Sequence, residues 1–209
     1  MFFSCFLAVW AEELVFLLLG DAYKNAWPVL LVMLFYPIHQ SLGQINGTLF
    51  RAVGETTLLM QITVVNLLIS LPLSFILMAP SGGEVFSGFQ MGALGLAIKV
   101  VGLNITFVNI ESWYISKRYS IPFQWRQQIS GVFVFVGIAY LTKIVGGYFY
   151  VTDSWFQLIL AIATSGFFYV LMSLVLVTKM PTVIGVRDID IVQIRSQVKM
   201  VFSRSLRGS

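Results

Sequence analysis

Long apolar stretches separated by short polar turns dominate this sequence. They fall at residues 1–19, 27–50, 57–79, 92–115, 127–149 and 155–178. Because a helix rises 1.5 Å per residue, about 20 apolar residues cross the ~30 Å hydrocarbon core of a bilayer. The pattern therefore predicts an all-α, polytopic bundle of about six transmembrane helices that has the lipid bilayer as its solvent.

The first apolar segment differs from the other five. It begins at Met1 without a polar lead-in, and Glu12 and Glu13 interrupt it. A signal peptide would need a basic stretch before the apolar run and a small-residue cleavage site after it, and this segment has neither. We expect residues 1–19 to be the distal half of a helix whose beginning is absent from this sequence.

Composition supports the membrane interpretation and excludes other classes. Apolar residues make up 58% of the chain and charged residues 11%, against roughly 45–50% and 25% in soluble domains. The single cysteine, Cys5, and the single histidine, His39, provide neither a disulfide framework nor a metal-ligand cluster. The basic residues behind the net charge of +4 lie between apolar segments and in the tail. We therefore expect no metal, no other cofactor and no nucleic-acid partner.

The distribution of Lys and Arg predicts the orientation of the bundle. One set of turns, together with residues 179–209, contains most of the basic residues, whereas the opposite turns contain Lys24 alone and several acidic residues. Since cytoplasmic loops are enriched in Lys and Arg, we expect the C-terminus in the cytoplasm and the bundle in the cell membrane. Residues 181–209 would form a basic cytoplasmic tail, either as a weak amphipathic helix on the inner leaflet or as a disordered chain.

Polar side chains within the 92–115 span follow steps of three and four and so share one face. The members of this face are Gly92, Gly95, Lys99, Gly102, Thr106 and Asn109. Small residues permit close helix contact, so a packing seam is one interpretation. Lys99 lies seven residues inside the span, or roughly 10 Å, where a lysine costs about 2.5–3.5 kcal/mol. It either snorkels to the outer interface or provides a cationic lining for an anionic substrate.

The 27–50 span is the most polar of the six. It includes Gln40, Gln44 and Asn46, and Arg51 follows it. Pro37 lacks a backbone donor and should kink or loosen the helix, which makes it a candidate hinge. The 57–79 span adds Asn66. The last two spans are almost wholly apolar, so we expect them to lie outside an aqueous pathway lined by the second, third and fourth.

Three local features occur in an order that points to a family. They are LLLGDAYKNAWPVL from Leu17 to Leu30, RAVGETTLL from Arg51 to Leu59, and MGALGLAI from Met91 to Ile98. Together they resemble the C-terminal half of polysaccharide flippases, which translocate lipid-linked oligosaccharides. That superfamily also includes the multidrug and toxic-compound extruders and the lipid II flippase. The resemblance covers about residues 10–120.

The resemblance implies a fold of two six-helix lobes around a central cavity, often with two extra C-terminal helices. Residues 1–115 would be the last four helices of the second lobe, the first of them partial, and residues 116–180 the extra pair. The missing N-terminal lobe would come from the same gene or from a companion chain. The substrate would be a polyprenyl-diphosphate-linked sugar repeat.

In that reading, Lys99 and Arg51 attract the diphosphate or acidic sugars. Six further side chains offer hydrogen bonds to sugar hydroxyls, and we chose them by polarity and helical face. They are Gln40, Gln44, Asn46, Asn66, Thr106 and Asn109.

Two other functions remain open. A multidrug or cation extruder of the same superfamily would need an intramembrane carboxylate, and the span candidate is Glu111. A non-transporting scaffold or assembly subunit would account for a half-length chain. An intramembrane enzyme is not expected, because no loop offers a histidine or a convincing pair of carboxylates.

Overall fold

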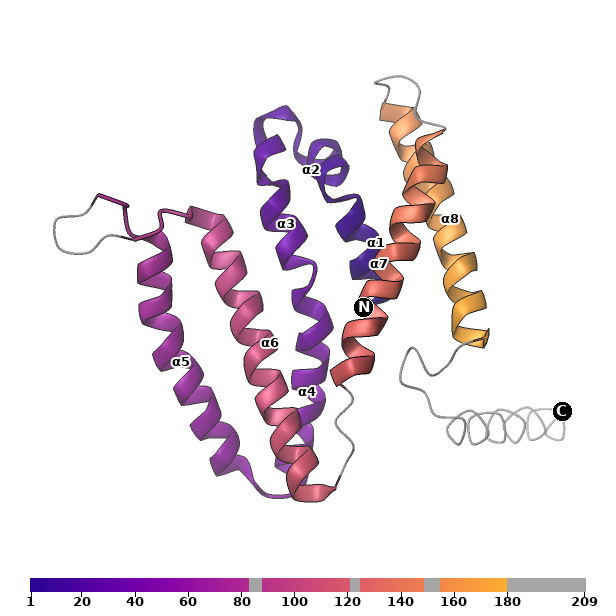
Figure 1. Ribbon diagram of the computed structural model, residues 1–209. Coiled ribbons are helices and arrows are strands. Elements are labelled where there is room, and N and C mark those ends of the chain that lie inside the picture. The colour runs from indigo at the N-terminus through magenta and orange to yellow at the C-terminus, as the bar shows by residue number, and fades with distance from the viewer. Residues whose placement is uncertain (83–87, 121–124, 149–154, 180–209) are drawn as a thin grey trace, which may run out of the picture.

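The computed structural model describes residues 1–82, 88–120, 125–148 and 155–179, which form helices and no strand (Figure 1). The basic tail expected at 181–209 lies outside the described residues. The elements are α1 (Phe2–Val9), α2 (Ala11–Leu19), the 3₁₀ helix η1 (Asp21–Ala26), α3 (Trp27–Met33), α4 (Tyr36–Ala52), α5 (Thr56–Met78), α6 (Gly92–Tyr119), α7 (Trp125–Gly147) and α8 (Trp155–Lys179).

The long apolar helices are those of a multi-pass membrane protein. Within the described residues, α5, α6, α7 and α8 are long and apolar enough to cross a bilayer, and α1 with α2 would add a fifth span if the bent pair is one. The expected all-α membrane bundle is confirmed at this level. The count of six spans stays a prediction, because the 27–50 segment is divided between α3 and α4.

Pro37 gives the physical reason for that division. It has no N–H to donate to the carbonyl of Met33, and its ring crowds the preceding turn. The α-helix is interrupted at Leu34 and Phe35. There Phe35 N donates to Val32 O at 3.1 Å, three residues back instead of the four of an α-helix. Pro37 then sits in the first turn of α4, a position that needs no backbone donor. The predicted loosening is present, and the hinge role stays a prediction.

A second interruption separates α1 from α2. The chain bends by 76° between the two helices. Trp10 lies at the bend, and its backbone N–H donates to Leu7 O at 3.1 Å. Glu12 and Glu13 occupy the first turn of α2, where the helix dipole favours carboxylates. The acidic pair that interrupts the apolar pattern therefore marks the start of a new helix.

The turn between α4 and α5 is closed by backbone hydrogen bonds around a glycine. Gly54 has φ +78°, a left-handed conformation that glycine adopts without a Cβ penalty. Gly54 N donates to Arg51 O at 3.2 Å, and Glu55 N donates to Phe50 O at 2.9 Å. Arg118 of α6 reaches Glu55 at 3.6 Å, which joins the turn to the end of α6.

Helix α6 is the centre of one half of the bundle. It packs against α5 on one side and against α3 and α4 on the other, so α5 and α4 are separated by α6 over most of their length (Figure 1). Helices α7 and α8 lie side by side at the edge away from α5, with α1 packed against α7.

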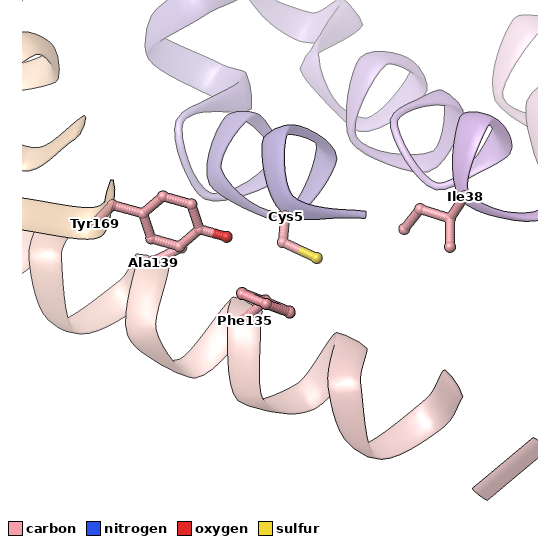
Figure 2. Close-up of a cluster of buried hydrophobic side chains, with 5 residues drawn as sticks. All are labelled: Cys5, Ile38, Phe135, Ala139 and Tyr169. Carbon is pink, nitrogen blue, oxygen red and sulfur yellow. The ribbon is translucent and has the colours of Figure 1, made fainter. Parts of the chain in front are cut away.

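The apolar pair α7–α8 forms a closely packed seam. A Cβ on Gly146 of α7 would lie 2.7 Å from Ala161 O of α8, so the helices approach too closely there for any larger residue. Tyr169 of α8 donates from its hydroxyl to Phe2 O at 2.9 Å. The buried cluster at this junction joins α1, α4, α7 and α8 (Figure 2) and consists of Cys5, Ile38, Phe135, Ala139 and Tyr169.

Candidate functional site

Lys99 lies in the interface between α5 and α6. Its Nζ donates to Ser70 Oγ at 3.0 Å and to Ser74 Oγ at 2.7 Å, both on α5. The helices touch nearby, since a Cβ on Gly95 would lie 3.3 Å from Leu77 Cβ. An ammonium group has three protons, so these two hydroxyls leave one donor without a partner among the described residues. Lys99 is therefore a half-buried cation with neutral partners.

Two other predicted residues share this seam. Asn66 is half-buried on α5, one turn before Ser70 and on the same face. Thr106 is two turns along α6 from Lys99 and is exposed, with its hydroxyl donating to Gly102 O at 2.8 Å. The structure thus places Lys99, Asn66 and Thr106 on the α5 side of α6.

Asn46 occupies the opposite side of α6. It is 8% exposed, and its side-chain amide donates to Ser112 Oγ at 2.9 Å, to Val108 O at 3.2 Å and to Glu111 Oε2 at 3.4 Å. All three acceptors belong to α6, so the hydrogen bonds of Asn46 join α4 to α6. Glu111, the carboxylate considered for an extruder, takes part in the same interface.

The remaining polar residues of α4 form a separate face. Gln40 is half-buried, whereas Gln44, Thr48 and Arg51 are exposed. Steps of four and three place these side chains on one face of the helix, turned away from Asn46 and Phe50, which pack toward α6. We call these four residues the polar face of α4.

An apolar groove of about 750 Å³ lies between α3, α4, α6 and α7. Asn109 is the one predicted site residue among those that line it, and its amide donates to Ile105 O at 2.7 Å. His39 also lines the groove and is half-buried there. The lining residues are Leu31, Val32, Phe35, Ile38, His39, Val101, Ile105, Asn109, Trp125, Gln128, Ile129, Val132 and Phe133.

The structure also contains an ion pair that the sequence did not reveal. Lys143 of α7 pairs with Glu13 of α2 at the bend between α1 and α2. The sequence pattern marks Glu13 only as an interruption of the first segment, and Lys143 lies in a span that is otherwise almost wholly apolar. The signal that could have joined them is that two opposite charges lie within apolar segments at the same membrane interface.

The predicted pathway residues therefore occupy four places within the described chain. Lys99, Asn66 and Thr106 lie on one side of α6, Asn46 on the other, and Asn109 in the groove. Gln40, Gln44 and Arg51 lie on the polar face of α4. Comparison of the chain with protein-family models, with curated proteins and with solved structures gives no match.

Proposed function

We propose that this chain is part of a translocator of lipid-linked oligosaccharide repeat units for polysaccharide biosynthesis and export. It would lie in the cell membrane with its C-terminus in the cytoplasm. The observation that carries the proposal is that one helix, α4, bears two unlike surfaces. Its polar face has Gln44 and Arg51 exposed, while Ile38 and His39 line the apolar groove.

The cargo has the same two-part chemistry. A sugar diphosphate must remain in water or hydrogen-bonded to protein, because hydrocarbon offers it no partners. A polyprenyl chain is apolar and partitions into the hydrocarbon of the bilayer. The groove, lined mostly by aliphatic and aromatic side chains, suits the hydrocarbon part, and its polar members His39, Asn109 and Gln128 could orient an amphiphile.

The polar face of α4 needs either water or a protein partner. Charged residues within membrane segments almost always face a bundle interior or an aqueous cavity. We propose that a second helical lobe, in the same polypeptide or in a companion chain, closes a cavity against this face. Arg51 would then attract the diphosphate or acidic sugars. Lys99 lies across α6 from this face, in the interface with α5, and we propose it as a second cation of the pathway.

Depletion of the protein in its own cells tests the proposal. Lipid-linked repeat units should accumulate on the cytoplasmic leaflet and surface polysaccharide should fall, and the wild-type gene should restore both. Unchanged lipid-linked sugar and polysaccharide after depletion would contradict the proposal. Greater sensitivity to toxic cations with normal polysaccharide would favour an extruder, and copurification with a biosynthetic complex without lipid-linked accumulation would favour a scaffold.

Lys99 has its own test within that assay. Lys99→Leu should not restore polysaccharide, whereas Lys117→Leu, which removes an exposed cation from the same helix, should. Because Lys99 also holds α5 against α6, the double variant Ser70→Ala/Ser74→Ala serves as the packing control: it removes the partners and keeps the charge. Restoration by Lys99→Leu at normal membrane levels would remove Lys99 from the pathway.

A further inference from the structure

The bend between α1 and α2 is held by one lysine from a distant helix. Lys143 Nζ donates to Val9 O at 2.8 Å and pairs with Glu13 Oε1. The same nitrogen lies 4.9 Å from the ring centroid of Trp10. One cation thus contacts the last residue of α1, the residue at the bend and the first turn of α2.

Each of these three contacts compensates for a feature of the bend. The last carbonyls of a helix lack intrahelical partners, and Lys143 satisfies that of Val9. The carboxylate of Glu13 is 26% exposed, so it has lost most of its access to water and gains from a paired cation. Trp10, 3% exposed, offers an aromatic face that attracts an ammonium group.

Apolar contacts alone would not fix the angle between α1 and α2. Trp10 packs with Leu158 and Ala161, and Phe16 stacks on Trp155 with ring centroids 5.1 Å apart. Such contacts are non-directional and can be kept over a range of angles. Hydrogen bonds and a close ion pair depend steeply on geometry, so the contacts of Lys143 with both helices restrict the angle between them.

The bent pair also connects two walls of the groove. Helix α1 packs against α7, and α2 packs against α3, while α7 and α3 both line the groove. We infer that the Lys143–Glu13 pair is a latch that fixes the bend and thereby sets the separation of α7 from α3. Releasing the pair lets the bend relax and changes the width of the groove. The inference concerns conformation and does not depend on the proposed cargo.

Spin labels on either wall measure this separation in the full chain reconstituted in lipid bilayers. Met33 on α3 and Phe133 on α7 are both exposed and can carry labels after replacement by cysteine. Cys5, which is fully buried, should stay unlabelled. Lys143→Met and Glu13→Leu should each shift the mean distance by more than about 2 Å, a true rearrangement rather than side-chain adjustment. Lys143→Arg, which keeps charge and donors, should leave it unchanged.

Two further variants distinguish an effect of the ion pair on the groove from a contribution to stability alone. Glu12→Leu removes the neighbouring, exposed carboxylate and should not move the distance. The double variant Lys143→Met/Glu13→Leu leaves no unpaired charge, so it should fold even where a single variant does not, and it should show the shifted distance. A distance distribution like that of the wild type in the folded double variant would overturn the latch and leave the pair a contribution to stability alone.

Discussion

Asn46→Leu is the substitution whose effect follows most directly from the structure. Leucine has the same side-chain branching and is somewhat larger, so it leaves no cavity, but it removes the donor to Ser112, Val108 and Glu111. Hydrogen bonds between membrane helices contribute about 0.6 kcal/mol on average and at most about 1.7. The bond to Ser112, at 2.9 Å, has the best geometry, and the 3.4 Å bond to Glu111 is weaker. We expect a loss of about 1–3 kcal/mol, which includes the cost of a buried acceptor left without a donor.

Reversible unfolding of the purified chain in detergent or bicelles measures this loss. Gln44→Leu is the matched control, because it makes a similar change two residues earlier on an exposed position of the same helix. Its effect should stay within about 0.5 kcal/mol, as for most surface substitutions. If Asn46→Leu is no more destabilising than Gln44→Leu, the α4–α6 interface does not depend on Asn46 and the reasoning fails.

Three other predictions concern packing and backbone geometry. Gly146→Ala should lower the thermal midpoint, because its Cβ would meet Ala161 O at 2.7 Å, whereas Gly137→Ala, with nothing within 4 Å, should not; an equal effect of both would contradict the close seam. Tyr169→Phe should cost about 0.5–1.5 kcal/mol in the same unfolding assay by removing the hydrogen bond from its hydroxyl to a backbone carbonyl of α1, and no change would show that the bond contributes nothing. Pro37→Ala should slow amide hydrogen exchange at residues 34–38 by allowing a continuous helix, and unchanged exchange would show that proline does not cause the break.

The long spans could be predicted from the sequence because their signal is local. Helix α6, expected at 92–115, runs to Tyr119, and the extra turn contains Lys117 and Arg118, cations that the C-terminal end of the helix dipole favours. The 27–50 segment was expected as one span because its residues are apolar enough, but Pro37 divides it. Apolar length predicted the four long helices, whereas the breaks at Trp10 and Pro37 depend on local backbone geometry that this signal does not contain.

The sequence could not show which of the predicted site residues lie close together. Helical spacing grouped Gly95, Lys99 and Asn109 on one face. Gly95 and Lys99 do pack against α5, whereas Asn109 lines the groove between α3, α4, α6 and α7. Spacing does not say which neighbour a face meets, and α4 and α5 turn out to lie on opposite sides of α6. The Lys143–Glu13 pair and the groove likewise join segments far apart in the chain, so both emerge only from tertiary packing.

Thiol accessibility in native membranes tests most directly the claim that α4 separates an aqueous path from an apolar groove. We predict that a membrane-impermeant maleimide labels Gln44→Cys and that lipid-linked oligosaccharide protects this cysteine from labelling. Ile129→Cys, on the groove wall and 48% exposed, should react only with a lipid-soluble maleimide. Equal labelling of both positions by the impermeant reagent, or labelling of Gln44→Cys that the substrate does not change, would contradict the account.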